Sequence, residues 1–517
     1  MRAISAVFIF GVLVAFTKSV SSIKILCVFI VPSVSNQIVF QPIWRELSLR
    51  GHNVTVITPN PLRDSALTNL TEIDLSSAYD IYKNIDPEQL SHKNFLISNV
   101  NFMFELTLTL SDHAINNKKV QRLINDNATN FDLVITQTGY FFDVWKIFAL
   151  KYQVPIIGIS SLGLFLHSHD ALGNPTHPIV SPDMMLNFSG KLSFFDKVQS
   201  FLYNIWYRMF YYWYALPKAD KIARKYFGDD MPYLGDLEKN ISLLLLNVNP
   251  IIHNVRPNVP NVIEINQMHI KKRKPLPKDI QDYLDSAPQG VVYFSLGSNV
   301  KSANLTEQIR KEIVAGLGAL PYKVLWKWET DYLPNKPDNV MTKKWCPQQD
   351  ILAHPNIKVF VMQGGLQSIE EAITLEVPLV GMPFVTDQPS NIKRIVELGL
   401  GVKVDHKTLT RDILKDAIME VAQNPKYKEE VKKAKSILLD QPMKGVEKAV
   451  WWIEYVIRHK GARHLRSPAA DMTLLEYFMV DVVLFLLTCV VVALYSVYKL
   501  LSVLRAMLRS SQKIKKQ

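Results

Sequence analysis

Residues 23–59 read IKILCVFIVPSVSNQIVFQPIWRELSLRGHNVTVITP, and this stretch decides the fold. It begins with a continuous apolar run that is typical of a buried strand, passes through a helical segment at residues 40–49, and ends in a second apolar strand after Gly51. A strand, a helix and a strand in this order form a βαβ unit, in which the two strands run parallel. The sequence therefore predicts an α/β fold built on a parallel sheet.

Further strands are predicted at residues 132–136 and 155–160, so residues 23–250 are expected to form one doubly wound N-terminal domain. Within this domain the aromatic segment at residues 194–214 has three interpretations. It favours a packed helix, while a helix at a membrane interface and a wall of an acceptor pocket stay open as alternatives.

Residues 251–288 are rich in proline and contain the basic run KKRK, which indicates an interdomain linker. A second series of strands and helices starts at Gly290 and predicts a doubly wound C-terminal domain over residues 289–450, followed by a return segment over residues 451–480. We therefore expect two Rossmann-like domains that face each other across a cleft.

The two ends of the chain predict a membrane protein. Residues 1–22 have one arginine, an apolar stretch and a small-residue patch, as a cleaved secretory signal peptide does. Residues 481–504 are apolar over a length that predicts one transmembrane helix, and residues 505–517 form a basic tail. The positive-inside rule places this tail in the cytosol and the body in the lumen.

Two further features support that location. Lysines three and five residues from the C-terminus resemble an endoplasmic reticulum retrieval signal, although they equally fit a stop-transfer sequence. Sequons for N-glycosylation agree with a lumenal body, and they occur at Asn53, Asn69, Asn127, Asn187, Asn240 and Asn304.

Composition excludes a nucleic-acid-binding protein and a protein held together by disulfides. The formal net charge is +12, but half of that excess lies beyond Asp481, so no basic stripe remains that would indicate nucleic-acid binding. The cysteines are Cys27, Cys346 and Cys489, which are too few for a disulfide framework. Stability is therefore expected to come from packed cores.

One ordered set of residues in the second domain carries the strongest signal. It contains Trp345-Cys346-Pro347-Gln348, His354-Pro355, Gln363-Gly364-Gly365, Ser368, Glu371, Pro378, Pro383 and Asp387-Gln388. This set resembles the sugar-nucleotide signature of the UDP-glycosyltransferase family, in the membrane-anchored form found in animals and insects. The resemblance implies a GT-B fold and transfer of a hexose from a UDP-sugar to a small lipophilic acceptor.

The signature residues suit the base, ribose and sugar of the donor. Trp345 offers a flat ring on which uracil can stack, and Gln348 offers a donor and an acceptor to its edge. By resemblance, Glu371 accepts hydrogen bonds from the ribose hydroxyls, and Asp387 and Gln388 bind the sugar hydroxyls.

Other residues suit the diphosphate. Gly364 and Gly365 follow a predicted strand and open a helix, so that the backbone and the helix N-terminus can approach an anion. Ser368 can add a hydroxyl donor. By analogy with the family, Ser298 in a neighbouring loop completes this cradle.

The chain departs from the family at three positions. The resemblance implies a histidine as general base at Asn36, its aspartate partner at Gln137, and a histidine at Gln363. A neutral amide accepts no proton near neutral pH, and a neutral hydrogen bond is weaker than a charge-assisted one. The donor site is therefore expected to be kept, whereas proton transfer from an acceptor hydroxyl is expected to be impaired.

Three outcomes stay open. The enzyme can act on amines or ionised acceptors, which need no strong base, or His167, His169 or His177 can replace the missing base. Alternatively, the protein binds a UDP-sugar or an apolar molecule without turnover, as a regulatory partner of an active relative in a homo- or hetero-oligomer. A metal or cofactor is not expected, because no Asp-x-Asp motif lies in a suitable loop and the UDP-sugar is a co-substrate.

Overall fold

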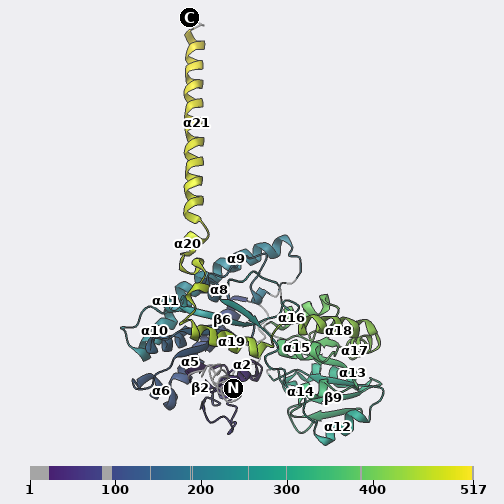
Figure 1. Cartoon of the computed structure of the whole chain (residues 1–517). Helices are drawn as coiled ribbons and strands as arrows, with labels where there is room; N and C mark the ends of the chain where they lie inside the picture. Colours follow the sequence, from purple (N-terminus) through teal and green to yellow (C-terminus); the bar gives the residue numbers. More distant parts are fainter. Residues whose placement is uncertain are drawn as a thin grey trace, which may run out of the picture.

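The structure is a computed structural model that describes residues 22–514, except residues 84–95, 140, 142, 187, 189, 254, 299, 385 and 386. The predicted signal peptide before residue 22, the sequon at Asn187 and the last three residues lie outside the described part. Figure 1 shows two lobes side by side and a long helix that projects from one of them.

The first lobe contains a seven-stranded parallel sheet in the order β3-β2-β1-β4-β5-β6-β7. Its strands are β1 (Lys24–Val28), β2 (Asn53–Thr58), β3 (Leu70–Asp74), β4 (Leu133–Gln137), β5 (Ile156–Ser160), β6 (Ile241–Asn247) and β7 (Val262–Ile265). Strand β1 pairs on both sides, with Ile25 opposite Val54 of β2 and Leu133 of β4. Because both faces of this sheet are covered, its central strands are mostly apolar.

The second lobe contains a six-stranded parallel sheet in the order β10-β9-β8-β11-β12-β13. Its strands are β8 (Val291–Ser295), β9 (Lys323–Lys327), β10 (Val340–Lys343), β11 (Ile357–Met362), β12 (Leu379–Gly381) and β13 (Gly401–Lys403). Two apolar clusters cover its two faces. The predicted α/β class with two doubly wound sheets is confirmed.

Helices cover both sheets. Those of the first lobe are α2 (Val34–Leu49), α3 (Ala78–Lys83), α5 (Leu96–Ile115), α6 (Lys118–Asn125), α7 (Ile147–Tyr152), α8 (Leu166–Leu172), α9 (Phe194–Phe210), α10 (Leu216–Phe227) and α11 (Leu234–Glu238), with short helical turns η1 (Asp143–Lys146), η2 (Met184–Leu186) and η3 (Tyr211–Ala215). Those of the second lobe are α12 (Lys278–Asp285), η4 (Ser302–Asn304), α13 (Glu307–Gly318), α14 (Gln348–Leu352), α15 (Leu366–Thr374), α16 (Gln388–Glu397), α17 (Arg411–Gln423) and α18 (Pro425–Leu439).

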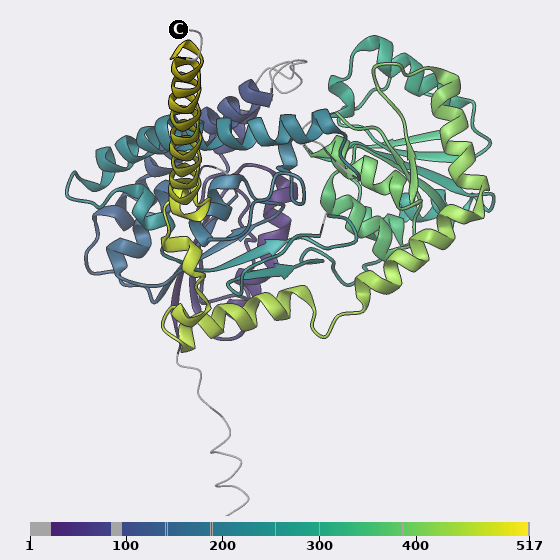
Figure 2. The ribbon, with the colours of Figure 1, turned by 90° about the horizontal axis from the view of Figure 1, so that it is seen from above.

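The chain crosses between the lobes twice. The segment predicted as a linker, residues 251–288, contains the edge strand β7 and the helix α12. The sequence did not predict β7, because the prolines around this four-residue strand hid its pattern. The chain returns to the first lobe in α19 (Gly445–Arg458), whose Ile453 and Val456 join the core under β1. Figure 2 shows α19 and α18 running along the edge of both lobes.

The C-terminal part leaves the body. After the short turns η5 (Arg463–Leu465) and η6 (Pro468–Asp471) come α20 (Leu474–Tyr477) and α21 (Val480–Ile514). By length and composition, residues Val480–Leu508 could cross a membrane, and none of the most apolar window is buried against the protein. This agrees with the predicted C-terminal apolar helix.

Gly445 lies at the second crossing, where α19 begins against the linker. A Cβ atom at this position would lie 1.9 Å from the backbone oxygen of Asn266 and 3.1 Å from Sδ of Met268. We expect Gly445→Val to lower the free energy of unfolding by about 1–3 kcal/mol, because the linker backbone must shift. Thermal unfolding of the detergent-solubilised chain measures this loss. The control Glu447→Val, on the exposed side of the same helix, should change the free energy by less than about 0.5 kcal/mol. Equal effects of the two substitutions would contradict the prediction.

Candidate functional site

A cleft of about 560 Å³ lies between the two lobes, at the carboxyl ends of the parallel strands. Ligands of doubly wound folds bind at this edge of a sheet. Ten of the predicted site residues line the cleft, and they are Asn36, Ser298, Trp345, Gln348, Gln363, Gly365, Ser368, Glu371, Asp387 and Gln388. Gly364 and Gln137 are not among the lining residues.

The start of α15 forms the inner wall of the cleft. Strand β11 ends at Met362, and Gln363, Gly364 and Gly365 lead directly into the helix. Gly364 has a φ of +94°, and a Cβ there would lie 2.7 Å from a side-chain carbon of Ile392. Only glycine fits this turn, so the sequence Gly-Gly determines the position of the helix N-terminus in the cleft.

Amide groups hold the carboxylate of Glu371 in place. Gln348 Nε2 donates to Glu371 Oε2 at 2.6 Å and to Ser368 Oγ at 2.9 Å, and Gln349 Nε2 donates to Glu371 Oε1 at 2.8 Å. Tyr293 O–H donates to Gln348 Oε1 at 3.2 Å. The network fixes one orientation of Gln348, Ser368 and Glu371 toward the cleft. The sequence did not predict the part that Gln349 and Tyr293 take in this network.

The neighbouring Glu370 points away from the cleft. It is fully buried, neither of its carboxyl oxygens has a hydrogen-bond partner among the described residues, and one oxygen lies 3.6 Å from Nδ1 of His269. Burial raises the pKa of Glu370 to about 8, so the group is protonated at neutral pH. His269 comes from the linker and its Nε2 donates to the backbone oxygen of Gln367 at 3.0 Å. The linker therefore supports α15 from behind.

Gln363 and Gln388 meet on the inner side of the cleft. Gln388 Nε2 donates to Gln363 Oε1 at 3.3 Å, and Gln388 Oε1 accepts from the Phe384 N–H at 2.9 Å. Asp387 accepts from Asn391 Nδ2 at 2.7 Å, and burial raises the pKa of Asp387. These side chains present amide and carboxylate groups to one end of the cleft.

A cation that sequence reasoning missed lies beside the predicted phosphate loop. Lys327, the last residue of β9, is nearly buried, and its Nζ donates to the Gly297 backbone oxygen at 3.0 Å and pairs with Glu329 at 2.9 Å. It lines the cleft next to Ser298. The sequence signal that could have identified Lys327 is its position near the end of the predicted strand KVLWKW. A positive charge is thus present although Gln363 carries none.

The mouth of the cleft is basic and aromatic. Trp345 is 65% exposed, and Lys271, Lys272 and Lys274 of the linker line the same opening. The linker backbone is attached here, because the Lys271 N–H donates to Gln349 Oε1 at 2.9 Å. An anionic ligand would approach the cleft along a positively charged rim.

On the first-lobe side, Asn36 and Gln137 do not form a pair in the structure. Asn36 lies in the first turn of α2, and its Oδ1 accepts a hydrogen bond from the Ser161 hydroxyl. Gln137 ends β4, is buried, and neither atom of its amide has a partner among the described residues. The Ser161 hydroxyl therefore takes the place beside Asn36 that the resemblance gives to Gln137.

The three histidines considered as replacement bases do not line the cleft. His167 stacks between aromatic rings and pairs with Tyr207, and His177 accepts backbone hydrogen bonds from Ile179 and Val180. Burial, followed by the charge of Arg256, lowers the pKa of His169 well below its usual value.

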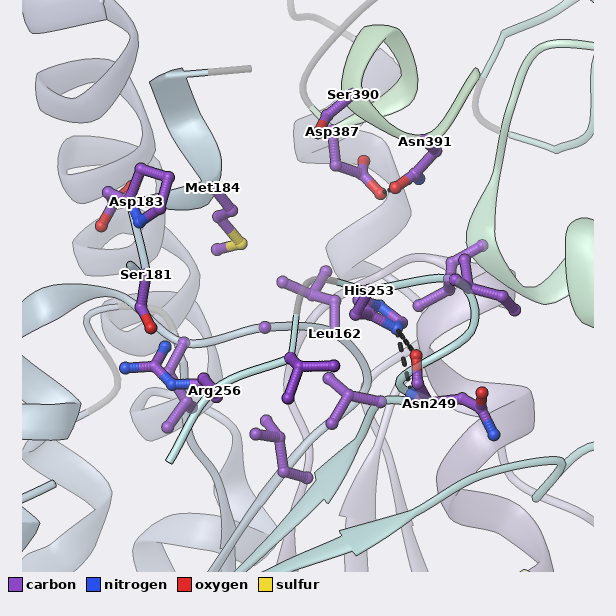
Figure 3. Close-up of a pocket in the computed structure, with 18 of the residues that line it drawn as sticks. Leu162, Ser181, Asp183, Met184, Asn249, His253, Arg256, Asp387, Ser390 and Asn391 are labelled. Atoms are coloured by element: carbon purple, nitrogen blue, oxygen red, sulfur yellow. Dashed lines mark hydrogen bonds between the residues drawn. The ribbon is translucent and has the colours of Figure 1, made fainter. Parts of the chain in front are cut away.

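A smaller cavity of about 150 Å³ adjoins the cleft, since Leu162, Met184, Leu366 and Asp387 line both. Figure 3 shows Met184 and His253 on its first-lobe walls and Asp387 with Asn391 at the start of α16. Burial lowers the pKa of His253 to about 4. Sequence reasoning missed this cavity because its residues come from distant loops.

Asp183 also lines this cavity and is a buried carboxylate of the first lobe. Its Oδ1 accepts from the Met185 N–H at 3.0 Å and from Tyr203 O–H at 3.3 Å, while Oδ2 is buried without a partner among the described residues. Burial raises the pKa of Asp183 to about 6. Asp183 is therefore a carboxylate that exchanges a proton near physiological pH.

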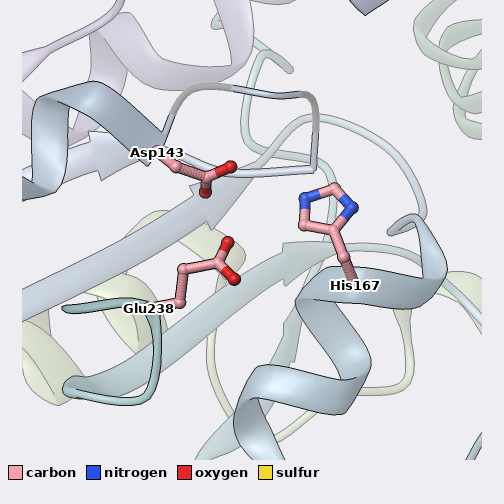
Figure 4. Close-up of side chains that lie close together, drawn as sticks. All are labelled: Asp143, His167 and Glu238. Atoms are coloured by element: carbon pink, nitrogen blue, oxygen red, sulfur yellow. The ribbon is translucent and has the colours of Figure 1, made fainter. Parts of the chain in front are cut away.

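A second group of charges is buried beneath the aromatic segment. Asp143, His167 and Glu238 point toward one another (Figure 4), with ligand atoms within 4.8 Å. The Lys146 ammonium contacts both Asp143 and Glu238, the latter at 3.1 Å, so a lysine already supplies the positive charge that a metal ion would bring. Burial and the charge of Asp143 raise the pKa of Glu238 well above its usual value. This cluster supports the fold of the first lobe and does not reach the cleft.

Known structures define the class of the fold. The chain is similar to the glycotransferase of kitacinnamycin, with a TM-score of 0.57 and 20% identity, covering 84% of this chain and 99% of that one. It is also similar to CalG4, the calicheamicin glycosyltransferase, with a TM-score of 0.54 and 17% identity, covering 85% and 99%. The two facing parallel sheets are thus the GT-B fold of glycosyltransferases.

Sequence comparison defines the family. The family described as "UDP-glucoronosyl and UDP-glucosyl transferase" matches residues 24–516. The chain is 33% identical to the UDP-glycosyltransferase UGT5 of Dactylopius coccus, over 95% of this chain and 94% of that protein. It is 31% identical to the UDP-glucuronosyltransferase 2B7 of Homo sapiens, over 88% of each. The chain belongs to the family of UDP-glucuronosyl and UDP-glucosyl transferases, and the predicted family is confirmed.

The buried charge cluster leads to a prediction about stability. Lys146→Met leaves Asp143 and the carboxyl of Glu238 buried without their cation, so the free energy of unfolding should fall by about 3–5 kcal/mol. Chemical denaturation followed by tryptophan fluorescence measures this change. The matched control is Lys278→Met, which removes an exposed lysine paired with Asp282 and should cost less than about 1 kcal/mol. A loss no larger than that of the control would show that the cluster does not need its lysine.

Proposed function

We propose that the protein transfers a hexosyl group, glucose or glucuronate, from a UDP-sugar to a small lipophilic acceptor, with impaired proton transfer from the acceptor. One observation carries this proposal. The cleft wall predicted to bind the donor is held by hydrogen bonds from Gln348 and Gln349 to Glu371, whereas Asn36, where the resemblance implies the base, is a neutral amide that accepts from Ser161.

The proposed donor pose uses the cleft from mouth to interior. Uracil stacks on Trp345 at the rim, and the ribose hydroxyls donate to Glu371. The diphosphate lies at the N-terminus of α15, where unpaired N–H groups and Ser368 face it and Lys327 adds a positive charge. The sugar then reaches Asp387 and Gln388. Stabilisation of the leaving diphosphate by these groups supports a reaction without a metal or cofactor.

The proposed difficulty lies on the acceptor side. Asn36 cannot remove a proton from a hydroxyl, and loss of a general base typically costs 10²- to 10⁴-fold in rate. Amines and ionised acceptors need less help, so they are the acceptors that this site favours. The runner-up function is a binding or regulatory member of the family, which holds a UDP-sugar without turnover and acts in a homo- or hetero-oligomer.

We further propose that the protein is a single-pass endoplasmic reticulum membrane glycoprotein with a cleaved signal peptide and a lumenal body. The apolar residues of α21, the basic tail that follows them, and the sequons on the body support this location.

Donor binding and turnover can be measured separately. Calorimetry should detect binding of UDP-glucose or UDP-glucuronate, and Trp345→Ala should weaken it by about 5- to 150-fold, because base stacking on an aromatic ring is worth about 1–3 kcal/mol. Product formation is then followed across hydroxyl, amine and thiol acceptors, with and without a chelator. Binding without product from any acceptor would overturn the enzyme proposal and favour the regulatory one.

Restoring the missing dyad tests the acceptor side directly. Asn36→His with Gln137→Asp should raise transfer to hydroxyl acceptors by about 10²- to 10⁴-fold, while donor affinity stays unchanged. The control Gln41→His places a histidine on the same helix, outside the residues that line the cleft. Unchanged hydroxyl transfer would assign the base to another group, and Asp183→Asn then tests the carboxylate of the adjoining cavity.

A further inference from the structure

Behind the cleft wall, Glu370 of α15 and His269 of the linker form a buried pair. Neither side chain is exposed, and among the described residues neither carboxyl oxygen of Glu370 nor Nδ1 of His269 makes a hydrogen bond. The two groups face each other, with Nδ1 of His269 3.6 Å from Oε2 of Glu370. Burying an unpaired carboxylate is costly, so the pair is expected to hold a proton.

The linker holds His269 against α15 in one orientation. Gln267 Nε2 donates to Thr374 Oγ1 at 3.0 Å at the end of the helix, and His269 Nε2 donates to the backbone oxygen of Gln367 at 3.0 Å near its start. A carbonyl oxygen only accepts, so Nε2 carries the proton of the neutral imidazole ring and Nδ1 presents a lone pair. Glu370 Oε2 therefore faces a hydrogen-bond acceptor.

Glu370 and His269 can satisfy this geometry in two ways. A protonated Glu370 carboxyl donates to Nδ1 after a small side-chain rotation that shortens the distance of 3.6 Å, or the proton moves to Nδ1 and an imidazolium faces a carboxylate. Both forms contain one proton besides the one on Nε2, and neither form carries a net charge. The pair is therefore neutral whichever group holds this proton.

His269 also contacts the carboxylate that the proposed donor pose assigns to the ribose. Its Nε2 lies 3.4 Å from Glu371 Oε1, the oxygen that accepts from Gln349 Nε2 at 2.8 Å. The imidazole ring of His269 thus lies between the carboxyl groups of Glu370 and Glu371. A negative charge on Glu370 would therefore repel the charge of Glu371.

The surrounding elements do not supply a second cation to Glu370. Their charged groups are Glu371 of α15, Lys271 of the linker, Asp350 of α14, and Lys428 and Lys435 of α18, which packs on α15. The two lysines of α18 pair with Glu376 beyond the end of α15, and Lys271 lines the mouth of the cleft. Among the described residues, His269 is the basic side chain that lies within ion-pair distance of Glu370. Glu370 therefore stays uncompensated once the pair loses its proton.

We propose that Glu370 and His269 are positioning residues of the donor site, which share one proton and so keep the space behind Glu371 free of net charge while Glu371 binds the ribose of a UDP-sugar. The inference rests on the proposed function, and it deepens that function by making donor binding depend on a proton that the donor does not touch. The role of the pair is electrostatic, because neither Glu370 nor His269 lines the cleft.

Loss of the shared proton should weaken donor binding. Burial raises the pKa of Glu370 to about 8, opposed by the backbone N–H of Gln267 and reinforced by the charge of Glu371. Burial lowers the pKa of His269, so the ring does not keep the proton in place of Glu370. Above about pH 8 a buried negative charge then lies behind Glu371, and affinity for an anionic UDP-sugar should fall by about 10-fold.

Calorimetry of the detergent-solubilised full chain with UDP-glucose tests this coupling. Because the donor binds the protonated pair more tightly, binding near pH 8.5 should take up about half a proton, which the dependence of the enthalpy on the buffer measures. This measurement on the unaltered chain needs no variant. Affinity should fall by about 10-fold between about pH 6.5 and about pH 9. Binding without proton uptake near pH 8.5 would overturn the proposal.

Glu370→Gln supplies the matched variant. The amide has the shape of the carboxyl and can donate to Nδ1 of His269, but it does not ionise, so affinity at about pH 6.5 should stay within about 2-fold. The fall in affinity at high pH and the proton uptake should both disappear. The control Glu376→Gln, which removes a carboxylate just beyond the same helix, should behave as the unaltered chain does. A Glu370→Gln variant that keeps the pH dependence would assign it to another group and overturn the proposal.

Thermal unfolding without donor reports the proton itself. The pKa of Glu370 is raised on folding, so the stability that its proton contributes is present at low pH and is lost as pH rises to about 8. The Tm of the unaltered chain relative to that of Glu370→Gln should therefore fall from about pH 5 to about pH 8 and level off above. A Tm difference that is independent of pH would overturn the shared proton.

Failure of the proposed function has a different signature. UDP-glucose would then not bind at any pH, which would overturn donor binding and with it the role given to the pair, while the Tm difference would still change with pH. Failure of the inference alone would leave UDP-glucose bound, with the same pH dependence in the unaltered chain and in Glu370→Gln.

Discussion

Within each sheet every strand runs parallel to its neighbours, and this constraint determines where the site lies. Parallel strands end at one edge of their sheet, so the loops after β1 and β5 open at one edge of the first sheet and the loops after β8, β9 and β11 open at one edge of the second. Because the two lobes face each other across these edges, Asn36 and Ser161 from one lobe approach Ser298, Lys327 and the start of α15 from the other. The cleft is therefore a consequence of topology, and the side chains only decide what it binds.

The wall of the cleft at α15 depends on preorganised polar contacts. Glu371 would be free to turn on its helix, but two glutamine amides and the linker histidine behind it leave one orientation. Such fixed groups cost little reorganisation when a ligand arrives, which is why they bind better than mobile ones. Gly364 contributes in the same way, since its positive φ sets the helix N-terminus at one place.

The sequence predicted the βα order and many of the residues that line the cleft, because both have local signals, namely apolar strands with glycine turns and a signature of about forty residues. It did not predict features that arise from distant contacts. Lys327 is a strand residue whose ammonium lies beside Gly297 only in the folded chain, and Asp183 acquires its raised pKa only because remote segments bury it. Strand β7 was hidden among prolines, and Ser161 beside Asn36 has no signal in the sequence at all.

The proposed function divides donor binding and proton transfer between the two lobes, and under this proposal one can be lost without the other. The predicted donor contacts come from β8 onward, while Asn36 and Gln137 belong to the first sheet. Residues that share no partners usually contribute independently to free energy. Under the proposed function, neutral amides at the two dyad positions of the first lobe leave the Gln348, Gln349 and Glu371 network intact. The site that we propose therefore keeps its affinity for the donor, while its choice of acceptor shifts toward groups that give up a proton without help.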